Sequence, residues 1–198
     1  MIDEKGAHLL DPGYYNETHL AELGFRSLGT NVMIARDSII VGIPNVAIGS
    51  NVRIDSNVTF AAISGSLTIG DYVHIGGGSH INCTGGVSIG SYVAISQGVK
   101  IYSASDDYSG IFMTNPTVPR HLRRDQVGEI NIGDHVIIGS GSVVLPGVDL
   151  EMGAAIGALS LVKSNVAEFT LVAGSPAKYV RDRSRNVLSL SQELLPGI

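Results

Sequence analysis

Residues 132–167 read IGDHVI, IGSGSV, VLPGVD, LEMGAA, IGALSL and VKSNVA, which are six hexapeptides in an unbroken series. Each opens with an aliphatic residue and carries a small or β-branched residue at its fifth position. A six-residue period fits neither an amphipathic helix nor a single alternating strand. It fits a short strand followed by a tight turn, stacked as a β-helix, of which hexapeptide repeats are a signature. The period therefore predicts an all-β fold.

The same register extends upstream to residue 28. All eighteen first positions are apolar: Leu28, Ile34, Ile40, Ile48, Ile54, Phe60, Ile69, Ile75, Ile81, Ile89, Ile95, Ile101, Ile132, Ile138, Val144, Leu150, Ile156 and Val162. Extra residues interrupt the series only after every third hexapeptide. Three hexapeptides therefore form one coil, and we expect a triangular prism of about six coils over residues 28–167. Because coils stack at about 4.8 Å, the prism is about 30 Å long, with all insertions leaving from one corner.

The two ends of the chain lack the period. Residues 1–27 are predicted to form an N-terminal cap, with a short helix within 14–25 that places Leu20 and Leu23 on one face. This cap would cover the open edge of the first coil. Residues 168–198 are predicted to form a C-terminal extension. It would end in a helix of about three turns over 186–195 that packs on a coil or on a neighbouring subunit.

Composition limits the class of protein. A chain of 198 residues accommodates one domain, and its net charge of −5 argues against nucleic acid as the main partner. The single cysteine, Cys83, excludes an internal disulfide framework. The sequence shows neither a signal-peptide core nor an apolar run near the length of a membrane span. We therefore expect a soluble cytoplasmic protein without a membrane span.

The longest interruption of the repeat, residues 102–131, contains the residues with the richest chemistry. A loop of this length on a regular scaffold is usually functional or disordered, and its aromatic and aliphatic content argues against disorder. It carries the adjacent carboxylates Asp106 and Asp107, the imidazole of His121 and a cluster of arginines. The carboxylates either form loop turns and ion pairs with those arginines or border an acceptor pocket against a neighbouring chain.

Three motifs resemble those of the hexapeptide-repeat acyltransferases: IGSGSVVLPGV from 138, IGALSLV from 156 and VAGSPAK from 172. The resemblance covers roughly residues 15–185 and is strongest to the branch with galactoside, maltose and serine acetyltransferases and the nucleotide-sugar acetyltransferases. It implies a left-handed parallel β-helix, a homotrimer, and acetyl-CoA bound in a groove between two prisms. The hand of the helix follows from this resemblance alone.

The resemblance also implies a set of cofactor-binding residues. Ser140 and Gly141 match the positions at the thioester end of acetyl-CoA, and Ala158 matches a position along the pantetheine arm. The matches to the basic residues at the adenosine phosphates are Lys163, Lys178 and Arg181. Small residues let a ligand approach the backbone, and Lys or Arg suits phosphate. Packing within the hexapeptide is the alternative explanation for Ser140 and Ala158.

The chain departs from the sugar O-acetyltransferases at one position. Those enzymes carry a histidine general base in the loop after the Ile101 strand, and Asp106 stands at the matching position here. A carboxylate with a pKa near 4 is a poor base for a hydroxyl, whereas a neutral amine attacks a thioester unaided. We therefore predict an acetyltransferase that acts on a sugar or a nucleotide-linked amino sugar, in the synthesis of a bacterial surface polysaccharide. O-acetylation with His80 or His121 as the base is left open.

Two other classes of protein remain open. The missing histidine is also compatible with a non-catalytic β-solenoid scaffold. A scaffold, however, would have no reason to keep Lys163, Lys178 and Arg181 beside a groove of small residues. His74 and His80 invite comparison with the γ-class carbonic anhydrases, which are built on the same kind of prism. That metal site needs three converging histidines, whereas these two lie on different faces of one coil. We expect no metal.

Overall fold

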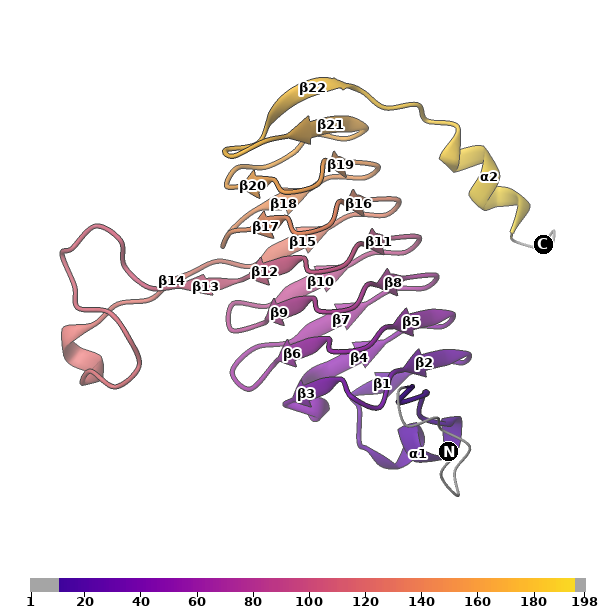
Figure 1. The fold of residues 1–198 in the computed structure, drawn as a ribbon, viewed down its shortest axis with the longest axis horizontal. Coiled ribbons are helices and arrows are strands. Elements are labelled where there is room, and N and C mark those ends of the chain that lie inside the picture. The colour runs from indigo at the N-terminus through magenta and orange to yellow at the C-terminus, as the bar shows by residue number, and fades with distance from the viewer. Residues whose placement is uncertain (1–10, 195–198) are drawn as a thin grey trace.

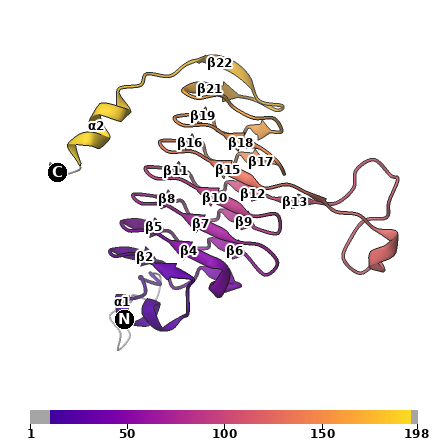
Figure 2. The same ribbon diagram turned by 180° about the vertical axis from the view of Figure 1, so that it is seen from behind.

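The computed structural model of the protein describes residues 11–194. The chain winds into a triangular prism whose three faces are β-sheets (Figures 1 and 2). Residues 1–10 of the predicted cap and residues 195–198 of the predicted tail lie outside the described residues. No helix in the described part is long and apolar enough to cross a membrane.

Each coil contributes one strand to each of three sheets, here numbered 1 to 3. Sheet 1 contains, in spatial order, β1 (Ser27–Leu28), β4 (Val46–Ile48), β7 (Leu67–Ile69), β10 (Val87–Ile89), β15 (Ile130–Ile132) and β18 (Asp149–Leu150). Sheet 2 contains β2 (Val32–Ile34), β5 (Val52–Ile54), β8 (His74–Ile75), β11 (Ala94–Ile95), β16 (Ile137–Ile138), β19 (Ala155–Ile156), β21 (Thr170–Ala173) and β22 (Lys178–Asp182). Sheet 3 contains β3 (Ile39–Val41), β6 (Thr59–Ala61), β9 (His80–Asn82), β12 (Lys100–Tyr102), β17 (Val143–Val144) and β20 (Leu161–Val162).

These sheets confirm the predicted prism. Six coils are complete, and β21 adds one side of a further turn before β22 folds back on it in antiparallel register. The first positions of the hexapeptides point into the core: sixteen of the eighteen are buried, while Leu28 and Ile40 are half-buried against them. The stack is therefore held together by burial of these columns of aliphatic side chains, which is the main favourable term in folding.

Corner 1/2, between sheets 1 and 2, requires a left-handed backbone. Five residues there have φ between 55° and 60°: Asn31, Asn51, Tyr72, Tyr92 and His135. Asparagine adopts this region readily, whereas tyrosine does so less often and needs support from its surroundings. The rings provide it, since Tyr72 stacks on Tyr92 at 5.2 Å and Tyr92 on His135 at 4.9 Å between ring centroids.

Insertions leave from corner 3/1, between sheet 3 and the next strand of sheet 1, as the sequence predicts. The first is the short helix η1 (Ile43–Asn45), and the longest follows β12. This long excursion has a neck of two antiparallel strands, β13 (Ala104–Ser105) and β14 (Gln126–Val127), and also contains η2 (Arg120–Leu122). Figure 1 shows it reaching well beyond the prism. Its outer part is therefore free to meet something other than its own coils.

The N-terminal helix α1 (Glu17–Glu22) lies at the open end of the first coil. Asn16 caps it by accepting a hydrogen bond from the His19 amide at 2.8 Å. Leu20 is 1% exposed and Leu23 is 42% exposed, and both line one apolar hollow beside the first coil, on the same side of the helix. The helix ends at Glu22, and Leu23 is its C-terminal cap, with its amide donating to the Leu20 carbonyl.

The C-terminal helix α2 (Val187–Glu193) is about two turns long, shorter than the three predicted. It meets the prism through a polar contact, since the Ser191 hydroxyl lies 3.4 Å from Nε2 of His135. The Arg183 guanidinium anchors the preceding segment by donating to the carbonyls of His135 and Gly153. Leu190 and Leu194 of this segment are more than half exposed, so the predicted apolar packing on a coil is not observed.

Candidate active site

Small residues line the edge of the prism at corner 2/3, between sheets 2 and 3. Pairing of β16 with β19 places Ser140 directly beside Ala158 in the next coil, and the Leu159 amide donates to the Ser140 carbonyl at 2.9 Å. Ser140 and Ala158 are exposed, and Gly141 is half-buried. A Cβ on the preceding Gly139 would lie 2.5 Å from the Ala158 nitrogen, so only glycine fits there. The structure therefore brings three of the predicted cofactor residues together.

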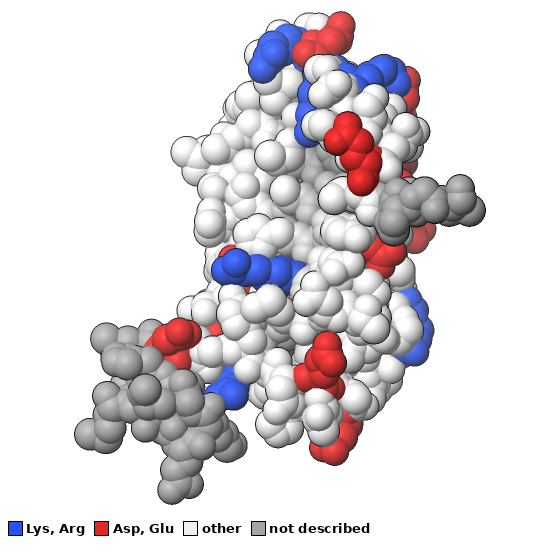
Figure 3. Space-filling model, turned by 90° about the vertical axis from the view of Figure 1, so that its right-hand side faces the viewer, with Lys and Arg blue, Asp and Glu red and all other residues white. Residues whose placement is uncertain are grey.

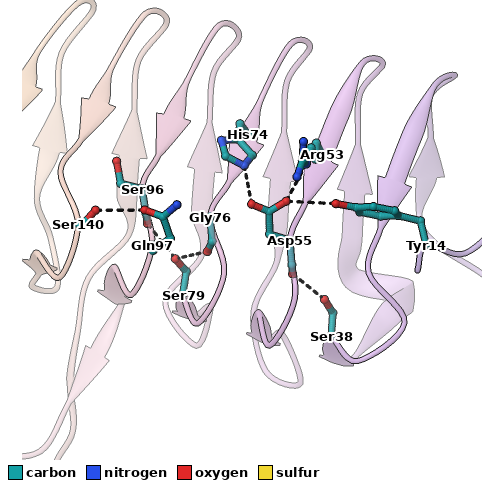
Figure 4. Close-up of polar contacts among 10 residues, drawn as sticks. All are labelled: Tyr14, Ser38, Arg53, Asp55, His74, Gly76, Ser79, Ser96, Gln97 and Ser140. Carbon is teal, nitrogen blue, oxygen red and sulfur yellow. Dashed lines mark hydrogen bonds and ion pairs between the residues drawn. The ribbon is translucent and has the colours of Figure 1, made fainter. Parts of the chain in front are cut away.

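The neighbouring coil extends this edge with polar groups. The Ser140 hydroxyl donates to Oε1 of Gln97 at 3.3 Å, and the Ser79 hydroxyl donates to the Ser96 carbonyl at 3.2 Å (Figure 4). Sequence reasoning missed Ser96 and Gln97, although their place in the hexapeptide is the same as that of Gly139 and Ser140. It also missed Leu159, an apolar side chain that is 76% exposed on the same edge.

Basic side chains gather at the C-terminal end of the prism (Figure 3). Lys163 and Lys178 line one hollow of about 360 Å³ together with Tyr179. Arg181 lies further along β22, opposite Leu171, and does not line this hollow. The structure thus brings two of the three predicted cations together and places the third on the adjoining stretch of strand.

The Asp107 carboxylate is engaged in hydrogen bonds within the excursion. Its carboxylate accepts hydrogen bonds from the amides of Phe112 and Ser109, each at 3.0 Å, and from the Ser109 hydroxyl at 2.7 Å. These bonds, that of the Phe112 amide first, lower the pKa of Asp107 to about 2. A carboxylate so weakly basic and so fully engaged is suited to ordering the loop. Its partners are amides and a hydroxyl, whereas the loop ion pair joins Arg123 to Asp125 at 2.8 Å.

Asp106 is the more available carboxylate. It is exposed, and its Oδ1 accepts a single hydrogen bond from the Asn115 amide at 3.1 Å. It lies just beyond corner 3/1, whereas Ser140 lies at corner 2/3, so the whole width of sheet 3 separates them. A three-residue strand spans about 10 Å, which is too far for a contact between these groups in one chain.

His80 and His121, the two histidines considered as bases, lie in different parts of the structure. His80 lies on β9 beside Lys100 and Tyr102, and its pKa is lowered by burial and by the Lys100 charge. His121 is exposed in η2, in the outer part of the excursion. His74, which was considered together with His80 as a possible metal ligand, lies on sheet 2 and contacts Asp55. The described residues contain no group of three or more His, Cys, Asp or Glu that could hold a metal ion.

The role of Asp107 leads to a pH-dependent prediction. Because the pKa of Asp107 is lowered in the folded protein, its contribution to loop order is present above about pH 4 and is lost as the pH falls towards 2. At neutral pH we expect Asp107→Ala to speed trypsin cleavage at Arg120 and Arg124 several-fold. Melting of the prism should barely change. Unchanged cleavage would show that the loop does not depend on this carboxylate.

The stacked hexapeptide coils define the class of fold: a parallel β-helix. None of the protein-family models matches the chain. The chain is 46% identical over 184 residues to a dTDP-4-amino-4,6-dideoxy-D-glucose acyltransferase of Escherichia coli, covering 93% of this chain and 96% of that one. It therefore belongs to the hexapeptide-repeat acyltransferases, and its fold is the left-handed parallel β-helix.

Solved structures agree with this assignment. AntD, an N-acyltransferase from Bacillus cereus crystallised with dTDP and 3-hydroxybutyryl-CoA, matches with a TM-score of 0.89 and 32% identity, covering 92% of this chain and 96% of that one. A hexapeptide-repeat acetyltransferase from Vibrio cholerae, complexed with acetyl-CoA, matches with a TM-score of 0.58 and 24% identity, covering 84% and 76%, and supports the fold alone. The predicted family, fold and enzyme class are confirmed: the chain is an acyl-CoA-dependent sugar acyltransferase.

Proposed function

We propose that the enzyme transfers an acetyl group from acetyl-CoA to the amino group of a nucleotide-linked amino sugar of the dTDP-4-amino-4,6-dideoxyglucose kind. The observation that carries the proposal is the 46% identity, over nearly the whole of both chains, to an acyltransferase named for that acceptor. The N-acyltransferase complex with dTDP supports the same class of acceptor. Replacement of the histidine base by Asp106 fits an amine, which needs no proton removed before it attacks.

In the proposed complex, acetyl-CoA lies along corner 2/3. The thioester lies at Ser140 and Gly141, and the pantetheine arm passes Ala158 and the exposed side chain of Leu159. Exposed small residues one coil apart leave room for the arm to approach the backbone. The phosphates meet Lys163 and Lys178, which share one hollow, with Arg181 further along β22.

The reaction is a direct acyl transfer. The lone pair of the neutral amine attacks the thioester carbonyl, the nitrogen–carbon bond forms, and the carbon–sulfur bond breaks as the CoA thiolate leaves. Asp106 orients the amine or takes up the proton that it loses, and the thiolate is protonated on release. The Bacillus cereus enzyme has been crystallised as variants of an aspartate and of a serine ten positions before it. Ser96 and Asp106 have that spacing here, and Ser96 lies on the cofactor edge.

We also propose that the active site forms between two copies in a homotrimer. The excursion that carries Asp106 projects away from its own prism, so it is available to reach corner 2/3 of a neighbour. The outward side chains of sheet 1 are mainly polar, whereas sheets 2 and 3 expose Met33, Ile39, Val41 and Ile137 by 39% or more. Apolar surface of this kind is usually covered in an assembly. A mass in solution three times that of the 20.7 kDa chain would support the trimer, and a monomer would contradict it.

The proposed reaction is tested by release of free CoA thiol from acetyl-CoA with a panel of amino and hydroxy nucleotide sugars. Turnover restricted to amino sugars supports the proposal. Turnover with hydroxyl acceptors would instead favour O-acetylation, and His80 and His121 would be the first bases to test. The place of the reaction in surface-polysaccharide synthesis, and its cytoplasmic location, are part of the same proposal.

The basic end of the groove yields a separate prediction. Arg181→Ala and Lys178→Ala should each raise the KM for acetyl-CoA about two- to five-fold, as expected for an exposed charge that meets a phosphate. The KM for the acceptor should stay unchanged, because the acceptor lies at the other end of the groove. Steady-state kinetics at low salt measures both constants. An unaltered KM for acetyl-CoA in both variants would refute this placement of the adenosine phosphates.

A further inference from the structure

A cluster of polar side chains lies on sheet 2, on the N-terminal side of the cofactor edge (Figure 4). Asp55 is at its centre and accepts hydrogen bonds from Nε of Arg53 at 2.7 Å, from His74 Nε2 at 2.8 Å and from the Tyr14 hydroxyl at 3.4 Å. The Asp55 side chain is only 19% exposed, whereas that of Arg53 is 56% exposed. Burial disfavours ionisation of Asp55, but the bonds from His74 and Arg53 outweigh it and lower its pKa.

The geometry leaves the guanidinium of Arg53 open on its outer edge. One carboxylate oxygen accepts from Nε of Arg53 and the other from His74, so the acid holds the arginine from the side. Within the described chain the guanidinium also contacts Tyr14, whose ring centre lies 5.8 Å away. An arginine that only pairs with a carboxylate normally points its two terminal nitrogens towards that carboxylate. Here Nε faces the carboxylate and the side chain is 56% exposed, so the terminal nitrogens are accessible to a bidentate oxyanion.

The position of Arg53 within the fold is equally informative. The outward column of sheet 2 runs through Met33, Arg53, His74, Ala94, Ile137 and Ala155. The column continues through Leu171 to Arg181 on β22, so its two arginines, Arg53 and Arg181, lie towards opposite ends of the prism. The corner 2/3 residues between the cluster and the hollow at Lys163 carry no charge. Arg53 thus lies towards one end of the prism, and the basic hollow of Lys163 and Lys178 lies at the other.

The coil that follows Asp55 has three glycines at corner 2/3, and the side chain of Ser79 next to them is buried. Its corner is formed by Gly76, Gly77 and Gly78, with Asp55 one coil before and Ser96 one coil after. Two coil steps place Arg53 and Asp55 about 10 Å from Ser96. A Cβ on Gly78 would meet nothing within 4 Å, so the surface above this glycine is open.

From these contacts we infer that Arg53, positioned by Asp55 and His74, binds the diphosphate of a nucleotide-linked sugar acceptor. The three glycines form the floor beneath the sugar. This inference rests on the proposed function for the identity of the acceptor. The acceptor and acetyl-CoA then enter the groove from opposite ends of the prism, and their reacting atoms meet at Ser96 and Ser140.

The test measures binding of dTDP and of CoA separately, by titration calorimetry on the full chain. Arg53→Gln should weaken dTDP binding about 10- to 100-fold, the loss expected for charge-assisted hydrogen bonds, and leave CoA binding unchanged. The matched control is Arg26→Gln, because Arg26 is an exposed arginine that donates to Thr68 on sheet 1. Both affinities should be unchanged in this control.

A second variant tests the glycine floor. Gly78 has φ +71°, and Asn57 occupies the equivalent position one coil earlier with φ 58°, so Gly78→Asn is compatible with the backbone. A Cβ at Gly78 meets nothing within 4 Å, so the new side chain would fill open space. We expect the KM for the nucleotide sugar to rise at least ten-fold, with little change in dTDP or CoA binding.

The inference is overturned if Arg53→Gln binds dTDP as well as the wild type does. It is equally overturned if the wild type binds CoA and not dTDP. Failure of the proposed function has a different signature, because dTDP binding that depends on Arg53, without any acetylation of an amine, would preserve this site and refute the reaction.

Discussion

Asp106→Asn is expected to lower kcat for the amino-sugar acceptor about 100-fold, the lower range of what a positioned proton acceptor contributes. The amide of asparagine cannot accept the amine proton, yet it keeps an oxygen for the Asn115 amide that Asp106 now binds at 3.1 Å. The loop should therefore keep its structure, and the KM for acetyl-CoA should not change. Single-turnover kinetics at saturating acceptor measures the effect.

The matched control is Asp149→Asn, which removes a carboxylate on sheet 1, away from the site. Its kcat should equal that of the wild type. If Asp106→Asn retains full turnover, Asp106 has no role in the reaction, and the proton is transferred directly to solvent.

The same variant tests whether the site is shared between copies. Ala158→Trp should block the pantetheine arm, and it leaves the excursion intact. When equal amounts of the two variants assemble at random, about one quarter of all contacts, counted over mixed and unmixed trimers, join an intact corner to an intact loop. Co-expression should therefore restore about that fraction of activity from two inactive parents. No recovery would mean that Asp106 and the thioester edge act within one chain.

The second large effect concerns the fold. Phe60→Ala should destabilise the protein by about 3–5 kcal/mol, because it removes a fully buried ring and the stacked coils collapse only partly around the cavity. Phe60 is the only aromatic residue among the first positions of the hexapeptides, and it is 0% exposed. Urea unfolding followed by circular dichroism measures the change.

Phe112→Ala is the matched control for this prediction. Phe112 is 37% exposed in the excursion, so its removal should cost well under half as much. A loss below about 1 kcal/mol for Phe60→Ala would contradict a continuous core through the second coil.

The fold could be predicted from the sequence because its determinants are local and repeat. The aliphatic first positions and the small fifth positions recur in every coil, so register follows from counting alone. The insertions, each of which follows the third hexapeptide of a coil, then define corner 3/1. At the ends this reasoning loses its basis, which is why the predicted C-terminal helix is longer than α2.

The candidate site could be predicted only where the period runs through it. Ser140, Gly141 and Ala158 occupy repeat positions, and the structure places them on one edge. The excursion has no period, so the sequence could not distinguish the engaged Asp107 from the exposed Asp106. Arg53 and His74 are 21 residues apart and become neighbours only when two coils stack in register. Arg53 and His74 stand at outward positions of sheet 2 that are otherwise mostly apolar, and this contrast is the signal in the sequence that could have revealed the cluster.

The most direct test of the proposed reaction is the nature of the bond in its product. The enzyme would be supplied with isotopically labelled acetyl-CoA and dTDP-4-amino-4,6-dideoxyglucose, and the product would be treated with mild alkali before mass analysis. We predict one labelled acetyl group per sugar, held in an amide that survives the treatment. An acetyl group that alkali removes would be an ester, and it would contradict transfer to nitrogen.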